Sequence, residues 1–366
     1  MAGFFTLSAT YAEYPVIPTR ADALGWVRGA FHVHTTGSDG RGTVEEVAAA
    51  ARAAGLRFVV LTDHNDSPRE PAYVDGVLLV PGVELSTDHG HLVAFGMQRP
   101  LEGFRPWMDG GEAEAAVEKA GGVSVLAHPV QERNPWRHPE ATRRADGFEL
   151  YSADTFFRDA LRHPFRRLLP AVGAFFGQPL HGVMLLVEPQ PEATARLLEL
   201  AREKPRVALC SHDAHGLPPY EDVFQALAMY LPPVEGVGPE TLPEDPRAAA
   251  ERVVKGLASG RALCAFRALG EPEGFVLEGL DAERREAHVG DVLTVRLPPY
   301  AEDVVRLEVR GAGRLGADGR TVELVEEGAV QVEAWVRAPG RFFGSEWKPW
   351  LVPSPVRVLP RRNEGR

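Results

Sequence analysis

The stretch Gly29-Ala30-Phe31-His32-Val33-His34-Thr35-Thr36-Gly37-Ser38-Asp39-Gly40 decides the fold expected for the whole chain. Its apolar run predicts a short buried strand, and its Gly-Ser-Asp-Gly segment predicts a tight turn. Because side chains alternate across a strand, His32 and His34 are expected on one face, with Asp39 folded back over the strand end. The stretch therefore predicts a first strand that ends in metal-ligand side chains.

Similar apolar runs recur along the chain and alternate with helical patterns. The runs predict strands at Phe58–Leu61, Val77–Val80, Leu92–Phe95, Val123–Ala127, Gly147–Tyr151, Val183–Val187 and Val207–Cys210. The helical patterns are Thr43–Ala54, which opens with a capping box, Glu112–Ala120, Glu192–Glu203 and Pro246–Ser259. This alternation argues for right-handed βα units on a parallel sheet, and seven or eight units in about 240 residues is the size of a closed barrel. Residues 29–269 are therefore expected to form an α/β domain.

The pattern of apolar and polar residues changes after Gly270. Short, often alternating apolar runs predict strands at Phe275–Leu277, Val292–Leu297, Val304–Val309, Thr321–Val325, Ala329–Val336 and Val352–Val358. Such a series without comparable helices predicts a small antiparallel β-sandwich over residues 270–360. Residues 1–28 are expected to be an N-terminal extension, Leu231–Asp245 a surface loop, and residues 361–366 a polar tail.

Composition narrows the classes of function. The chain has 366 residues, 44% of them apolar and 25% charged, as expected of a globular protein with two domains. Its net charge of −11 opposes sequence-independent binding to nucleic acid. A small phosphorylated substrate remains compatible with that charge, because bound metal ions supply positive charge locally. The sequence leaves the oligomeric state open.

The termini and the two cysteines indicate a compartment. The first residues lack a basic region followed by an apolar run, and no segment reaches the roughly 18–20 apolar residues that span a bilayer. A cytoplasmic protein without membrane attachment is therefore expected. Cys210 and Cys264 lie in apolar settings and are expected to be buried, reduced thiols.

Further ligand-type residues fall at the ends of the predicted strands. They are His64, Glu84, His91, His128, Asp213 and His215. The carboxyl ends of barrel strands meet on one face, and burying several unpaired carboxylates there costs several kcal/mol each unless cations compensate. Imidazole with carboxylate suits Zn²⁺, Mn²⁺ or Fe²⁺, and nine ligands are too many for one ion. The cluster from His32 to His215 therefore predicts a site for two or three divalent ions.

The remaining histidines are assigned differently. His89 is two residues from His91 and is the alternative ligand at that position. His138, His163 and His181 have no strand-end placement and are expected to be surface or core histidines. His288 lies in the predicted sandwich and is given no role.

The motifs resemble those of a known family. Phe-His-Val-His-Thr-Thr-Gly-Ser-Asp-Gly, Thr-Asp-His-Asn, Pro-Gly-Val-Glu, His-Leu-Val-Ala-Phe-Gly, Ala-His-Pro and Ser-His-Asp-Ala-His are similar, in this order, to motifs of the PHP superfamily (polymerase and histidinol phosphatase domains). The resemblance covers residues 29–216. It implies a distorted (β/α)7 barrel with a two- or three-metal site. It also implies ligand roles for His32, His34, Asp39, His64, Glu84, His91, His128, Asp213 and His215.

The C-terminal region resembles one branch of that superfamily, named after carbaryl hydrolase (the CehA/McbA type). The likeness lies in the expected sandwich and in the stretch Glu346-Trp347-Lys348-Pro349-Trp350-Leu351-Val352-Pro353-Ser354-Pro355. His212 departs from the family pattern, which usually has a small residue before the Asp. It is either a substrate contact or an accidental replacement.

These residues predict a hydrolase. Two ions about 3.5–4 Å apart hold a bridging water and lower its pKa, so that hydroxide attacks phosphorus or a carbonyl carbon. Asp213 is expected to orient this hydroxide or accept its proton, with Asp63 beside it in the catalytic set. Asp63, Asn65 and Glu149 are also candidate partners of the ligating histidines, and Arg133 is a candidate phosphate contact. The leading hypothesis is a phosphoesterase for a small phosphomonoester or phosphodiester. The alternatives are a carboxyl-ester or carbamate hydrolase and a non-catalytic metal- or carbohydrate-binding module.

Overall fold

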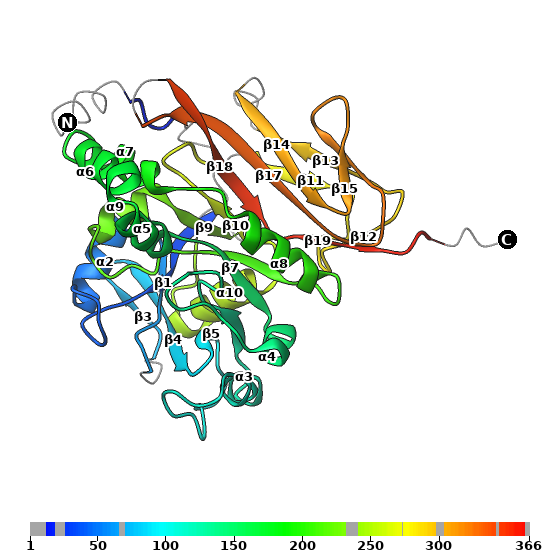
Figure 1. Ribbon diagram of the computed structural model, residues 1–366. Coiled ribbons are helices and arrows are strands. Elements are labelled where there is room, and N and C mark those ends of the chain that lie inside the picture. Colours follow the sequence, from blue (N-terminus) through cyan, green and yellow to red (C-terminus); the bar gives the residue numbers. More distant parts are fainter. Residues whose placement is uncertain are drawn as a thin grey trace.

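The computed structural model describes residues 12–18, 26–65, 70–231, 241–272, 274–297, 304–341 and 344–362. Within them the strands form a large mixed sheet of fifteen strands and a separate antiparallel sheet of four (Figure 1). The expected surface loop Leu231–Asp245 lies largely outside the described residues, as do most of the N-terminal extension and residues 363–366 of the tail. No helix in the described ranges is long and apolar enough to cross a membrane.

The first part of the large sheet carries the predicted ligand-bearing strands. They are β1 (Val27–Val33), β2 (Phe58–Leu61), β4 (Val77–Thr87), β5 (Gly90–Phe95), β6 (Val123–Leu126), β7 (Gly147–Ser152) and β8 (Val207–Ser211). β1, β2 and β4 are parallel, and so are β6, β7 and β8. β5 lies between the two groups and is antiparallel to both neighbours. The expected all-parallel arrangement is therefore wrong for β5. A two-residue turn at Asp88-His89 joins β4 to β5 as an antiparallel hairpin.

The two ends of this strand series meet at the carboxyl ends of β1 and β8. The Phe31 carbonyl accepts a hydrogen bond from the His212 N–H at 2.9 Å, and the Ala214 carbonyl accepts one from the His34 N–H at 3.0 Å. Val33 and Ala214 form a parallel bridge. The sheet order does not pair β1 with β8 themselves, so the closed barrel remains a prediction.

Helices cover the sheet where the sequence predicts them and at several further places. The described helices are α2 (Val44–Ala53), α3 (Gly110–Lys119), α4 (Pro139–Arg144), α5 (Ala153–Arg162), η1 (Pro164–Leu168), α6 (Leu169–Phe175), α7 (Pro179–Leu186), α8 (Pro191–Ala201), α9 (Tyr220–Ala226) and α10 (Pro246–Ala258). The capping box of α2 is present, with Thr43 and Glu46 bonded reciprocally. The strand predicted at Val183–Val187 is wrong, because this run belongs to α7. A short apolar run does not by itself distinguish a buried helix from a buried strand.

The C-terminal strands divide between the two sheets. β11 (Val276–Glu278), β13 (Val292–Arg296), β15 (Gly313–Leu315) and β16 (Thr321–Leu324) form the four-stranded sheet. The large sheet takes in β12 (Glu286–His288), β14 (Val305–Gly311), β17 (Gly328–Pro339), β18 (Ser345–Pro353) and β19 (Val356–Leu359), besides β3 (Ala72–Val74), β9 (Ala228–Leu231) and β10 (Leu263–Ala265). The run predicted as one strand at Val352–Val358 is two strands, parted at Ser354-Pro355. The C-terminal strands are antiparallel as expected, except that β12 pairs with β19 in parallel.

The sheet runs through the expected domain boundary. β10 pairs on one side with β9 and on the other with β18, so the C-terminal strands extend the sheet that holds the ligands. The Trp350 indole N–H donates to the Gly270 carbonyl at 2.7 Å. One apolar cluster runs from Ile17 to Val358. The domain boundary at residue 269 stays a prediction, and the residues on both sides of it share one apolar core.

The two cysteines form a disulfide, which corrects the expectation of reduced thiols. Cys210 on β8 and Cys264 on β10 are paired, with Cα atoms 5.6 Å apart. They are separated by 54 positions in the sequence. Their proximity arises from the fold, because α9, β9 and α10 return the chain to the neighbourhood of β8, and sequence spacing alone does not reveal it.

Candidate metal centre

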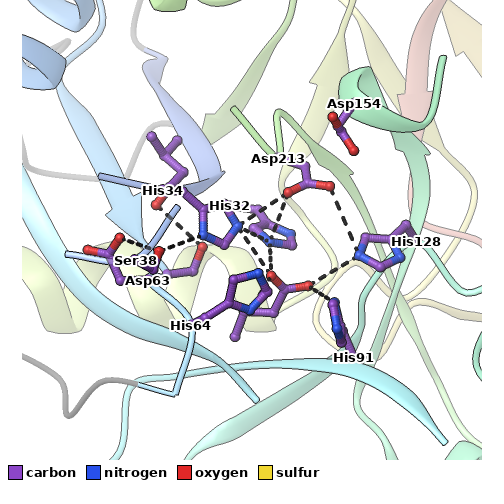
Figure 2. Close-up of polar contacts among 12 residues, drawn as sticks. His32, His34, Ser38, Asp63, His64, His91, His128, Asp154 and Asp213 are labelled. Atoms are coloured by element: carbon purple, nitrogen blue, oxygen red, sulfur yellow. Dashed lines mark hydrogen bonds and ion pairs between the residues drawn. The ribbon is translucent and has the colours of Figure 1, made fainter. Parts of the chain in front are cut away.

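A buried carboxylate, Glu84 on β4, lies among five imidazole rings. Figure 2 labels these rings, which belong to His32, His34, His64, His91 and His128. The Oε2 of Glu84 lies 3.2 Å from the Nε2 atoms of both His32 and His34 and 3.3 Å from the Nδ1 of His64. Its Oε1 lies 2.8 Å from the Nδ1 of His91 and 3.2 Å from the Nε2 of His128. One carboxylate thus joins five of the six predicted histidine ligands.

Two further carboxylates complete the cluster. Asp213 Oδ1 lies 3.4 Å from His32 Nε2 and 3.3 Å from His34 Nε2. Asp39 Oδ2 lies 3.3 Å from the Nε2 of His215 and 3.7 Å from the Nε2 of His64. The structure therefore brings all nine predicted ligands into one connected group.

The reversed direction of β5 explains the place of His91. The other strand-borne ligands follow or close parallel strands, whereas His91 stands near the start of its strand. Because β5 runs antiparallel, its beginning lies at the carboxyl ends of its neighbours. The alternative ligand, His89, lies elsewhere: its ring is 4.7 Å from that of His138, beside Asp109.

Three of the nine residues have unusual backbone conformations. The φ angles are 65° for His32, 28° for His128 and 45° for Asp213. Positive φ is uncommon for residues other than glycine, and such strain gathers at functional sites. His32 also falls within an irregularity in the pairing of β1 with β2, between Ala30 and Val33. The backbone is therefore bent out of regular strand geometry where these side chains enter the cluster.

The charges of the cluster are strongly coupled. Burial alone would lower the pKa of His34, but the Asp213 and Glu84 carboxylates raise it to about 9. His128 behaves in the same way, and its pKa is raised to about 9 mainly through Glu84. Burial would raise the pKa of Glu84 and of Asp213, but the surrounding imidazoles hold both well below their usual range. Without a metal, protons on the imidazoles balance the carboxylates.

The donor set fits divalent cations in place of those protons. Three overlapping groups have one ligand atom per residue within 4.8 Å of one another, namely His32–His34–Glu84–Asp213, His34–Asp39–His64–His215 and His64–Glu84–His91. The Nδ1 of His64 is buried and has no hydrogen-bond partner among the described residues, although Glu84 lies close to it. Imidazole and carboxylate together suit divalent ions such as Zn²⁺, Mn²⁺ or Fe²⁺, so these groups can hold divalent metal, and the number of ions stays a prediction.

Two predicted partner residues lie directly behind ligands. Glu149 Oε1 is 2.6 Å from His32 Nδ1, and its Oε2 accepts from the His128 backbone N–H at 2.7 Å. Asp63 accepts from the Thr35 N–H at 2.7 Å and from the Ser38 hydroxyl at 2.8 Å. The same Ser38 oxygen lies 3.3 Å from His34 Nδ1, so Asp63 steadies His34 through Ser38. These contacts agree with the partner role expected for Asp63, and its expected catalytic role stays a prediction.

The other three candidates, Asn65, Arg133 and His212, are placed differently. The Asn65 side-chain amide donates to the Ser86 hydroxyl at 3.0 Å and accepts from the Ser86 backbone N–H at 2.8 Å. Arg133 is exposed in the loop after β6. His212 is buried, where its Nδ1 accepts from the Phe31 N–H at 3.2 Å and its Nε2 donates to the Leu227 carbonyl at 2.8 Å. Both ring nitrogens of His212 are thus engaged by the backbone, which leaves neither for a substrate contact.

The structure adds two residues that the sequence analysis missed. Asp154, in the first turn of α5, is drawn with Asp213 in Figure 2. It lines a pocket together with Asp213 and His215 and forms an ion pair with Arg158 one turn later. Burial, followed by the charge of Asp213, raises the pKa of Asp154 to about 6. Asp154 follows the predicted strand Gly147–Tyr151, so the search of strand ends that found the ligands would have found it there.

The same pocket has a largely apolar wall. Besides four polar residues, Asp154, His212, Asp213 and His215, it is lined by apolar side chains that include Phe156, Val183, Leu186, Leu217 and Leu227. The cluster therefore has ionic groups on one side and an apolar surface on the other.

No protein-family model matches the chain, and no curated protein matches it. Solved structures with partial similarity to this chain include a two-domain protein from Bacteroides vulgatus that contains a predicted PHP-like metal-dependent phosphoesterase. It is 14% identical, with a TM-score of 0.45, over 92% of this chain and 98% of that one. PsfC from Pseudomonas syringae is also 14% identical, with a TM-score of 0.42, over 67% of this chain and 93% of that one. A lesion-specific endonuclease from Pyrococcus furiosus is 15% identical, with a TM-score of 0.23, over 28% and 35%. Likenesses of this strength leave the function to be argued from the residues.

Proposed function

We propose that this chain is a metal-dependent hydrolase of the PHP type that acts on a small phosphate ester. The observation that carries the proposal is the nine-residue group centred on Glu84, in which every motif residue contacts another member. Nine such side chains have no structural need to gather at one place, and five of them (His32, His34, Glu84, His128 and Asp213) are buried, which is costly unless cations compensate.

Two or three divalent ions bound there would supply a water of lowered pKa and positive charge for the transferring group. The chain's own residues would divide the remaining work. Asp213 has one oxygen toward His32 and His34 and the other 4.0 Å from His128, so it is placed to orient a water at the centre of the cluster or to accept its proton. Glu149 and the Asp63–Ser38 pair fix the orientation of His32 and His34.

Asp154 and Arg158 would act on the substrate side of the cluster. A carboxyl group whose pKa is about 6 holds or releases a proton near neutral pH, which suits protonation of a leaving group. Arg158, paired with Asp154, places a guanidinium beside the same pocket and can contact an anionic group. These two residues favour a phosphate ester over a neutral substrate.

The second candidate is a carboxyl-ester or carbamate hydrolase of the CehA/McbA type. The apolar pocket wall beside Asp213 and His215 favours it, because a phosphate needs no such surface while an apolar ester group does. A single substrate that joins an apolar group to a phosphate would use both sides of the site.

Two measurements test the proposal. Elemental analysis of the purified chain should find two to three divalent ions per chain, and a chain without metal even after reloading would contradict the cluster hypothesis. A screen with Mn²⁺ should then show turnover of p-nitrophenyl phosphate or bis-p-nitrophenyl phosphate. Turnover of p-nitrophenyl acetate alone would select the second candidate. Bound metal without turnover of any of the three would instead support a non-catalytic binding module.

A further inference from the structure

A row of exposed apolar side chains follows the helices after β7. Phe165 and Phe176 are each 80% exposed, Leu161 is 50%, Leu169 45% and Val172 40% exposed. These five residues, here called the outer stripe, include the two most exposed phenylalanines of the described ranges.

Apart from Leu161 near the end of α5, the outer stripe lies along η1, in which no residue is buried, and along the exposed side of α6. η1 and α6 follow each other directly, and Phe165, Leu169, Val172 and Phe176 are spaced by four, three and four residues, which aligns them along one side. The opposite side of α6 is buried through Pro170, Ala171, Gly173 and Ala174. The buried side of α6 therefore packs this helix onto the rest of the protein, and the side chains of the outer stripe take no part in that packing.

We propose that the outer stripe is the contact surface for a second copy of this chain. The two phenylalanines alone leave about 300 Å² of aromatic surface in water, and the three aliphatic residues bring the stripe to about 500 Å². Monomers rarely expose more than a few hundred Å² of contiguous apolar surface. A symmetric pair buries the patch twice, roughly 1,000 Å² in all, which reaches the lower limit of specific interfaces.

The charges around the outer stripe favour a protein partner over an anionic lipid surface. Three of the four arginines between residues 158 and 167 are ion-paired within the chain, Arg158 with Asp154, Arg162 with Glu132 and Arg167 with Glu188. The segment is thus largely neutralised, and the whole chain carries −11. An anionic surface would be repelled by the chain without a strong basic patch to compensate. A second copy needs only apolar contact there, and arginine is enriched at protein interfaces.

Formation of this dimer would also restrain a helix that lines the pocket beside the metal centre. α5 has Asp154 beside the pocket in its first turn and Leu161 of the outer stripe in its last turn. A partner that packs on Leu161 and Phe165 would hold the end of the helix whose first turn lines the pocket.

Sedimentation of the full chain at about 1–50 μM tests the interface. The wild type should sediment as a dimer, at twice the 39.9 kDa of one chain. Phe165→Ser with Phe176→Ser should shift it to the monomer, whereas Trp107→Ser, which removes a 68% exposed aromatic outside the outer stripe, should leave the dimer intact. A monomeric wild type, or a dimer that persists in the double variant, would overturn the proposal.

Cross-linking tests the symmetry. Leu169 is the middle residue of the outer stripe, so antiparallel packing around a two-fold axis places it near its own copy. Leu169→Cys should give a covalent dimer on mild oxidation, and Val276→Cys, on the small sheet and 44% exposed, should not. Equal cross-linking of both variants would show that the contact is unspecific. If wild-type chains stay monomeric but sediment with phosphatidylglycerol vesicles, the occupant is a membrane and the proposal is wrong.

Discussion

The Nδ1 of His32 lies 2.6 Å from Oε1 of Glu149, so this ring directs its Nδ1–H at a carboxylate and its Nε2 at the centre of the cluster. A neutral imidazole has one N–H and one lone pair, and the partner of one nitrogen fixes the role of the other. Glu149 therefore selects the tautomer of His32 that can ligate a metal. Its second oxygen holds the backbone of His128, so one carboxylate positions two ligands.

Glu149→Gln should weaken metal binding by about 10–100-fold, because an amide is a poorer acceptor for the His32 N–H and no longer fixes its tautomer. The measurement is a titration of the metal-free chain with Mn²⁺ or Zn²⁺. Glu114→Gln is the matched control. Glu114 lies on α3, outside the metal centre, and is a buried carboxylate that pairs with Arg144 at the end of α4. Equal affinity of the Glu149→Gln chain and the wild type would show that His32 is oriented by other groups.

Asp213→Asn should remove most of the activity and leave the fold intact. The amide cannot accept a proton, and general-base contributions are typically about 10²–10⁴-fold in rate. The measurements are kcat with saturating metal and the thermal unfolding midpoint. Bound metal should be quantified in the same samples. If turnover is close to that of the wild type, the proton acceptor has been misassigned.

Asp154→Asn should lower kcat by about 10–100-fold with little change in metal content, because Asp154 lines the pocket but contacts none of the nine ligands directly in the described structure. The loss should be smaller for a substrate with a good leaving group such as p-nitrophenol, which needs no protonation. Asp159→Asn, one helical turn farther along α5, is the control. A uniform loss with all leaving groups would argue for a positioning role through Arg158.

The metal centre was largely predictable from the sequence because strand ends are local features. A ligand such as His64 or His128 directly follows an apolar run, and the carboxyl ends of parallel strands converge whatever the rest of the fold. The motif identified His91 as a ligand but did not explain why it stands at the start of its strand. That position follows from the antiparallel direction of β5, which depends on pairing partners that the sequence alone does not reveal.

Features that depend on contacts between distant segments were missed. His212 follows β8 directly, as a ligand would, yet its ring is held by the backbone at Phe31 and Leu227, on two other elements. α7 was mistaken for a strand because burial on all sides removes the helical periodicity. The pairing of Cys210 with Cys264 required the position of β10 next to β9, which no local pattern encodes.

The disulfide predicts a measurable contribution to stability. In the chain-entropy model, closing a loop of 54 residues contributes about 4 kcal/mol. Cys210→Ala with Cys264→Ala should lower the free energy of unfolding by up to that amount, as seen in urea denaturation. Thiol titration of the unfolded, unreduced chain should first find no free thiol. Two free thiols would restore the expectation of reduced cysteines.

Burial of His212 predicts sensitivity to mild acid. Burial lowers the pKa of His212 to about 4, below the value of about 6.5 that applies in the unfolded chain. A folded pKa lowered in this way contributes stability that is present above pH 6.5 and lost as the pH falls toward 4, by at most about 3 kcal/mol. His34 and His128, with pKa values raised to about 9, are already protonated in the folded, metal-free chain throughout this range and do not offset the loss.

His212→Gln should therefore flatten the dependence of unfolding free energy on pH between 6.5 and 4.5, measured with excess EDTA so that metal loss does not contribute. Some slope should remain, because burial also lowers the pKa of His181 to about 4. His288→Gln, on β12 at the edge of the large sheet, is the control and should keep the full slope. An unchanged slope in His212→Gln would mean that His212 becomes protonated without unfolding the chain, with the Phe31 contact rearranged to accommodate a second N–H.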